Sequence, residues 1–326
     1  MALVEVKNLK KYFVNNDGLL YKLTNKGPIN VRAVDDVSFE IEKEDTLAVV
    51  GESGCGKTTV ARSVLRLIEP TAGKILYKGK SINDFNKKEL KNFRSDAQMI
   101  LQDPRSSLNP RFIVEEIVSE PLYIHDKIED DFNLLDRVWE LLDMVGLAKR
   151  YSELFPHELS GGQARRVGIA RALALQPEFI VCDEPTSGLD ISIMSAILNL
   201  MKKLQQEYHL TYLWISHNLH EVRYISNKVA VMYLGKIVEI TDTDTIFNNS
   251  VHPYTEALFS SLRSVNDDWN YKEREIIEGE VPSPIDPPSG CSFHPRCKYS
   301  FDKCKKIEPE LKSVEANHLT ACHLYN

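Results

Sequence analysis

The sequence predicts an α/β fold, because strands and helices alternate around a phosphate-binding loop. Residues 51–59 read Gly-Glu-Ser-Gly-Cys-Gly-Lys-Thr-Thr, directly behind the apolar run at 46–50, and a helical pattern of apolar residues follows them. Apolar strands at 178–182 and 211–216 flank a stripe of helical spacing at 191–209. Such alternation is typical of a sheet that is covered by helices.

Two strands are expected at the start of the chain, at 3–13 and 31–41, where apolar and polar residues alternate. The segment 14–30 between them is polar and carries Gly, Asn and Pro, so we expect a surface excursion. At 134–145 the apolar residues share one helical face, which predicts an amphipathic helix.

The chain changes character near residue 250. Strand 229–234 leads through a turn at Gly235-Lys236 into another strand. Prolines and then four cysteines follow in place of regular patterns. We therefore divide the chain into a nucleotide-binding domain at 1–250 and a C-terminal extension at 251–326.

Composition limits the partners and the compartment. The 326 residues carry a net charge of −7, which argues against nucleic acid because proteins that bind it usually present a basic face. The sequence has no run of about 18 apolar residues and no signal-peptide pattern at its start. We therefore expect a cytosolic chain that does not span a membrane by itself.

The glycine-rich loop has the residues that bind a nucleoside triphosphate. Gly51, Gly54 and Gly56 let backbone N–H groups converge on phosphate oxygens, and the helix behind them starts with its positive end on the anion. Lys57 reaches the β- and γ-phosphates, while Thr58 offers its hydroxyl to Mg²⁺. The expected ATP-binding residues of this loop are Gly51, Ser53, Gly54, Cys55, Gly56, Lys57, Thr58 and Thr59.

Further motifs restrict the class of NTPase. The segment Leu-Ser-Gly-Gly-Gln at 159–163 opens a helix and supplies a second anion-binding N-terminus. An apolar strand ends in two acids, of which Asp183 suits Mg²⁺ through water and Glu184 can polarise the attacking water. The candidate residues of these motifs are Gln102, Ser160, Gly161, Gly162, Gln163, Asp183, Glu184, Asp190 and His217.

This order of motifs resembles the nucleotide-binding subunits of ATP-binding-cassette (ABC) transporters over roughly residues 3–260. The resemblance implies a P-loop NTPase fold of the ABC cassette type, with a RecA-like core, an antiparallel β-subdomain and an α-helical subdomain at about 103–172. A small Cys-rich C-terminal extension follows. The resemblance also implies that two cassettes sandwich two ATP molecules, each signature segment facing the γ-phosphate held by the partner's loop.

Carried over by position, the resemblance assigns roles. Phe13 would stack on adenine, with Tyr12 as the alternative. Glu184 would be the general base and His217 would contact the γ-phosphate. Gln102 would touch Mg²⁺ and the attacking water. The expected Mg²⁺ ligands are Thr58, Gln102 and Asp183.

Three further segments, at 102–110, 252–258 and 290–297, resemble the oligopeptide, dipeptide and nickel importer subfamily. The form Ser-Ser-Leu-Asn-Pro-Arg in the first is more like the second of two paired cassettes, the F-type subunit. The resemblance implies a heterodimer with a second ABC ATPase on two membrane permease subunits, at the cytoplasmic face, served indirectly by an extracytoplasmic solute-binding protein. Peptides, nickel, metallophores and oligosaccharides are all open as cargo.

Four of the six cysteines crowd into the C-terminal extension, and in a reducing cytosol such a cluster favours a metal site over disulfides. The spacing lacks the short C-x2-C pairs of a zinc ribbon, and four thiolates on loops suit a [4Fe–4S] cluster, which members of the resembled subfamily carry. Zinc and unligated thiols stay as alternatives. We expect the cluster to stabilise the fold of a tail that is too short to form a core of its own. We also expect that this tail does not pack against the nucleotide site. The expected ligands are Cys291, Cys297, Cys304 and Cys322.

The rival class is a soluble ABC ATPase that acts without a channel. DNA-repair members insert a long coiled coil and translation members carry two cassettes, whereas this chain has one phosphate loop and no sustained heptads. Accessory subunits of phosphonate breakdown resemble the same subfamily and stay as the alternative. An iron–sulfur protein with an incidental nucleotide site is disfavoured by the intact Glu184 and His217.

Overall fold

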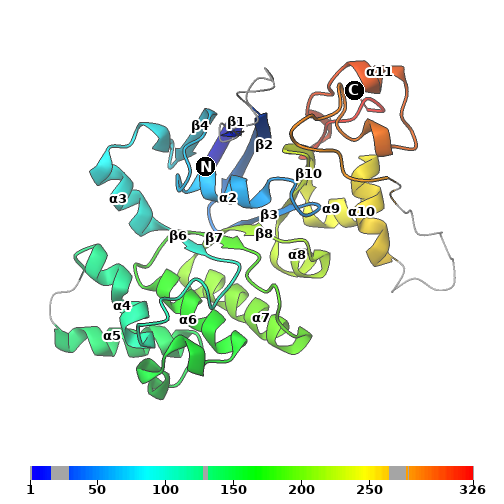
Figure 1. Cartoon of the computed structure of the whole chain (residues 1–326). Helices are drawn as coiled ribbons and strands as arrows, with labels where there is room; N and C mark the ends of the chain where they lie inside the picture. The colour runs from blue at the N-terminus through cyan, green and yellow to red at the C-terminus, as the bar shows by residue number, and fades with distance from the viewer. Residues whose placement is uncertain (1, 16–28, 128–130, 264–276, 278, 326) are drawn as a thin grey trace, which may run out of the picture. The chain divides into compact units, whose positions relative to one another are not determined.

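The computed structural model describes residues 2–15, 29–127, 131–263, 277 and 279–325 (Figure 1). Most of the predicted surface excursion therefore lies outside the described residues. None of the helices in these ranges combines the length and the apolar character that a membrane span requires.

The chain forms two compact units. Unit 1 consists of residues 41–46 and 84–215, and unit 2 of residues 2–40, 47–83 and 216–326. The phosphate loop and the C-terminal extension thus belong to unit 2, whereas the signature helix and the two acids of the strand motif belong to unit 1.

Unit 1 combines a small parallel sheet with helices. Its elements are α3 (Lys87–Asp96), β6 (Ala97–Ile100), α4 (Val114–Ile124), α5 (Asp131–Met144), α6 (Gly161–Leu173), β7 (Phe179–Asp183), α7 (Ile191–Tyr208) and β8 (Thr211–Ile215), with short 3₁₀ turns at Lys149–Glu153 and Pro156–Glu158. The strands lie in the order β8-β7-β6, all parallel. Every residue of β7 and β8 is buried, as expected for a parallel sheet that is covered on both faces.

Unit 2 combines two sheets (Figure 1). Its elements are β1 (Ala2–Asn15), β2 (Ile29–Glu42), β3 (Thr46–Val50), α2 (Lys57–Val64), β4 (Ala72–Tyr77), β5 (Lys80–Ser81), α8 (Leu219–Ile225), β9 (Lys228–Tyr233), β10 (Lys236–Asp242), α9 (Thr243–Asn249), α10 (Pro253–Arg263), α11 (Asp302–Lys306), β11 (Lys312–Glu315) and β12 (His318–Thr320). One sheet has the order β2-β1-β4-β5, and the other includes β11-β12-β10-β9-β3. Strand β3 runs parallel to β9 and is fully buried, so it delivers the chain to the phosphate loop from the core.

The turn between β9 and β10 lies one residue earlier than predicted. Lys236 pairs with Tyr233, so the turn residues are Leu234 and Gly235, with φ of 43° and 79°. A two-residue hairpin turn of type I′ needs positive φ at both positions. The sequence did not indicate Leu234 as a turn residue, because a leucine rarely adopts a positive φ.

The C-terminal extension packs onto the rest of unit 2. Strand β12 pairs with β10, and β11 pairs with β12. At the pairing with β10, His318 lies 2.7 Å from the buried carboxylate of Glu239. Arg296 of the extension forms an ion pair with Glu52 of the phosphate loop at 2.9 Å. The expectation that the tail does not pack against the nucleotide site is therefore wrong, because no local pattern reports a contact between such distant segments.

Candidate nucleotide site

Glycines hold the phosphate loop in its turn conformation. Gly51, Gly54 and Gly56 have φ of 155°, 79° and 109°. A Cβ atom on Gly56 would lie 2.1 Å from the carbonyl oxygen of Ala33, so a larger residue does not fit there. Gly56 is also the N-cap of α2. The N-terminus of this helix and its first residue, Lys57, therefore lie directly at the phosphate loop.

Lys57 is held inside the loop. Its side chain is buried, and Nζ donates to the carbonyl oxygens of Gly51 at 2.8 Å and Glu52 at 2.9 Å. The Sγ atom of Cys55 lies 3.7 Å from the same Nζ. Burial raises the pKa of the Cys55 thiol, so this residue is a neutral, small component of the loop.

The acids of the strand motif lie at the end of β7. Asp183 is buried, and Glu184 adopts φ of +46°, a strained conformation for a residue other than glycine. The backbone N–H of Glu184 donates to the carbonyl oxygen of Ile215 at 3.0 Å. The side-chain amide of Gln102 donates to Oε2 of Glu184 at 2.8 Å. Two of the three predicted catalytic residues therefore meet within unit 1.

Arg165 on helix α6 fixes the segment that carries Gln102, and it belongs to none of the motifs identified in the sequence. Its guanidinium donates to the carbonyl oxygens of Leu101 and Gln102, both at 2.5 Å. The residue is 1% exposed, and burial lowers its pKa to about 10, which still leaves it charged at neutral pH. The sequence could have indicated Arg165, because it is a charged residue among apolar, buried positions of a helix, where charged residues usually have a specific partner.

The signature helix begins with a capping box. Ser160 Oγ accepts from the backbone N–H of Gln163 at 3.3 Å, and the side chain of Gln163 accepts from the N–H of Ser160 at 2.8 Å. A Cβ atom on Gly162 would lie 2.8 Å from the side chain of Ile193, so glycine lets α7 approach. Ser160 is exposed at this helix start, where the sequence predicts an anion-binding group.

Two further predicted residues lie on loops. Asp190 is exposed at the N-cap of α7 in unit 1. In unit 2, His217 is exposed directly before α8. Asn218 pins this loop, because its side chain accepts from the N–H of His220 at 3.0 Å and donates to Glu221 at 3.2 Å. The position of His217 is thus set by a helix cap next to it.

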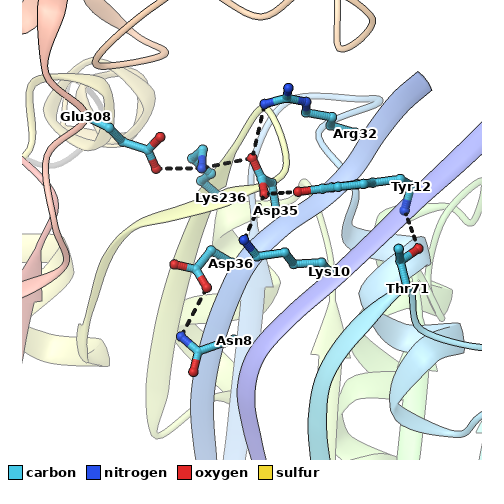
Figure 2. Close-up of polar contacts among 9 residues, drawn as sticks. All are labelled: Asn8, Lys10, Tyr12, Arg32, Asp35, Asp36, Thr71, Lys236 and Glu308. Carbon is cyan, nitrogen blue, oxygen red and sulfur yellow. Dashed lines mark hydrogen bonds and ion pairs between the residues drawn. The ribbon is translucent and has the colours of Figure 1, made fainter. Parts of the chain in front are cut away.

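An ionic cluster distinguishes the two candidate adenine-stacking residues. Figure 2 shows the hydroxyl of Tyr12 donating to Asp35, at 2.5 Å, beside an ion pair of Asp35 with Lys236 at 3.1 Å. Burial and the Asp35 carboxylate raise the pKa of Tyr12 to about 12. Phe13, by contrast, is 43% exposed. This geometry favours Phe13 over Tyr12 for stacking on adenine, which is also the order that the resemblance implies.

The four cysteines of the extension lie close enough to influence one another. Burial, together with the neighbouring thiols Cys297 and Cys304, raises the pKa values of Cys291 and Cys322 to about 11. All four are free thiols. Among the described residues, no group of three or more His, Cys, Asp or Glu side chains is arranged to hold a metal ion. The predicted iron–sulfur cluster therefore gains no support from the ligand geometry.

Comparison with known proteins identifies the family. The family model of the ABC transporter matches residues 34–187, and that of the oligopeptide/dipeptide transporter C-terminal region matches residues 238–304. The oligopeptide transport ATP-binding protein AppF of Bacillus subtilis is 46% identical over 100% of this chain and 98% of its own length. The chain belongs to this family of ABC transporter ATP-binding proteins. The oligopeptide transport ATP-binding protein OppF of Salmonella typhimurium is 41% identical over 98% of this chain and 96% of its own.

Solved structures confirm the predicted ABC cassette fold. A dimeric post-hydrolysis state of the ATP-binding cassette MJ0796, bound to ADP and phosphate, matches with a TM-score of 0.65 and 28% identity. The match covers 74% of this chain and 98% of that one. The chain is thus an ABC transporter ATPase, the ATP-binding subunit of an importer of the oligopeptide and dipeptide type.

Proposed function

We propose that this subunit hydrolyses ATP to drive the import of oligopeptides or dipeptides, as one cassette of a dimer bound to membrane permeases. The observation that carries the transport class is the match of residues 238–304 to the C-terminal region of oligopeptide and dipeptide transporters. The hydrogen bond between Gln102 and Glu184 supports the hydrolytic role, because it orients the carboxylate that we assign as general base.

The residues of the chain divide the catalytic work. Lys57 and the backbone N–H groups of the phosphate loop bind the phosphates. Thr58, Gln102 and Asp183 supply oxygen ligands of the kind that Mg²⁺ prefers, and a bound Mg²⁺ would neutralise charge on the transferred phosphate. Glu184 accepts the proton of the attacking water.

The proposed partners are a second, paired ABC cassette and two membrane permease subunits, with an extracytoplasmic solute-binding protein acting indirectly. The support is the exposed signature helix start, together with the dimeric state named for the cassette MJ0796. The chain would then lie peripherally on the cytoplasmic face of the membrane. The alternative, an accessory ATPase of phosphonate breakdown, would hydrolyse ATP without peptide transport.

The test is a Glu184→Gln variant in proteoliposomes that contain the assembled transporter. Loss of the general base should lower ATP turnover and peptide uptake roughly 10²- to 10⁴-fold while ATP still binds. Glu207→Gln, which changes an exposed carboxylate on α7, is the matched control and should keep normal rates. Near-normal turnover in Glu184→Gln would remove this residue from the mechanism, and ATP turnover without peptide uptake would favour the accessory-ATPase alternative.

We further propose that the four cysteines of the extension bind a [4Fe–4S] cluster with a structural role. The proposal rests on the number and residue type of these four neighbouring thiols, and not on their arrangement in the structure, since such a cluster is held by four thiolates. Protein purified without oxygen should contain about four iron atoms per chain and absorb broadly in the visible range. Cys297→Ser should lose the iron, whereas Cys182→Ala, which alters a buried thiol of β7, should retain it. Stoichiometric zinc without iron would contradict the assignment.

A further inference from the structure

An ion pair within unit 2 joins the C-terminal extension to the phosphate loop. Both carboxylate oxygens of Glu52 accept from the guanidinium of Arg296, at 2.9 and 3.2 Å. The side chain of Arg296 is 7% exposed and that of Glu52 is 25% exposed. A two-pronged, partly buried contact of this kind is among the stronger polar interactions in proteins.

The backbone of Glu52 is fixed at the same time by two other residues. Its N–H donates to the hydroxyl oxygen of Tyr254, on α10, at 3.0 Å. Its carbonyl oxygen accepts from Nζ of Lys57 at 2.9 Å. Glu52 therefore connects two parts of the extension, Arg296 and helix α10, with Lys57 of the loop.

Aromatic residues next to Arg296 fix its position for the contact with Glu52. Phe293 is buried and packs edge-on against Tyr233, with ring centroids 5.3 Å apart, and lies 5.4 Å from the ring of Tyr254. The N–H of Arg296 donates to the carbonyl oxygen of Phe293 at 3.0 Å, and its guanidinium lies 5.9 Å from the centre of the Tyr233 ring. The arginine is thus presented to the loop by a short, packed turn.

We propose that Arg296 is a positioning residue for ATP binding, which acts through Glu52. The pairing neutralises a carboxylate on the loop that has to receive a polyanion, and it holds the loop carbonyl that Lys57 contacts. Without Arg296, the Glu52 charge would repel the triphosphate. The extension, which is typical of the subfamily, therefore also contributes to ATP binding. This inference rests on the proposed binding of ATP by the phosphate loop.

Charge repulsion predicts an asymmetric result for the two partners. In the full-length chain, Arg296→Gln should weaken ATP binding about tenfold, whereas Glu52→Gln, which removes the repelling charge, should weaken it about twofold or less. The double variant should resemble Glu52→Gln alone, so the coupling between the two sites should be about tenfold. Arg296→Lys keeps the charge without the paired geometry and should recover most of the affinity.

The salt dependence of ATP affinity distinguishes an electrostatic role of Arg296 from a purely structural one. The deficit of Arg296→Gln should shrink as ionic strength rises from about 0.05 to about 0.5 M, because added salt screens the repulsion between the unpaired Glu52 carboxylate and the triphosphate. The matched control is Glu308→Gln, which removes another ion pair of the extension, at 2.6 Å from Lys236, and leaves the loop untouched. This control should bind ATP like the wild type.

Titration with a fluorescent ATP analogue gives the affinities, and thermal unfolding shows that each variant is folded. Normal affinity in Arg296→Gln, equal and salt-independent losses in Arg296→Gln and Glu52→Gln, or an equal loss in Glu308→Gln would each overturn the inference. A wild-type chain that binds no ATP would instead contradict the proposed function.

Discussion

Glu184 combines a strained backbone with an oriented side chain. Its φ of +46° is uncommon outside glycine, and its N–H bond to Ile215 helps to fix this conformation. The amide of Gln102 then sets the direction of the carboxylate. Strain of this sort is found where the surroundings determine the geometry, which is what a general base needs to meet one water molecule repeatedly.

Replacing Phe13 tests which ring stacks on adenine. Because Tyr12 is engaged by Asp35 and Phe13 is exposed, Phe13→Ala should weaken ATP binding about 5- to 150-fold, since stacking on a base contributes about 1–3 kcal/mol. Tyr12→Phe removes only the hydroxyl and should leave the affinity unchanged. Equilibrium titration with ATP measures both, and normal affinity in Phe13→Ala would exclude it as the stacking ring.

Helix α6 serves the site at two points. Its N-terminus carries the signature residues, and Arg165 one turn later fixes the backbone of Gln102. The sequence predicted the strands and helices that carry the site because their apolar residues recur with a clear period. It missed β11 and β12, which are too short to show a period, and Arg165, whose role depends on carbonyl oxygens about 60 residues away along the chain.

Arg165→Lys tests this link between the signature helix and the proposed general base, Glu184. A lysine supplies no two-pronged donor, so buried carbonyl oxygens lose partners and Gln102 loses its anchor. The free energy of unfolding should fall by roughly 2–4 kcal/mol, and ATP turnover should fall at least about tenfold. Arg166→Lys, which changes a contact with the carbonyl oxygen of Val145, is the control and should keep most of the turnover. Chemical denaturation and steady-state ATPase rates distinguish the two variants.

At the scale of the whole molecule, motif order was sufficient to predict an ABC cassette, while the docking of the extension was not predictable. Glu52 and Arg296 are 244 residues apart in the sequence, and neither belongs to a pattern that points to the other. Phe293 likewise has no periodic neighbours, although it is buried against Tyr233 and Tyr254. Local patterns predict elements, whereas contacts of high sequence separation depend on the packing of the complete fold.

Complementation between damaged chains tests whether ATP sites form across a dimer. The signature helix start at Ser160 is a second anion-binding group, which the phosphate loop of the same chain does not need. Two copies can be joined by a flexible linker, with Gly162→Asp in one copy and Lys57→Ala in the other. If the sites are composite, one site keeps an intact loop and an intact signature, so the fusion should retain up to about half of the ATPase rate of the wild-type fusion, because hydrolysis at each site needs both elements. Fusions with either change in both copies should be inactive. If each chain instead served its own ATP, both copies of the mixed fusion would be damaged, and a rate no higher than that of the doubly changed fusions would contradict the shared-site arrangement.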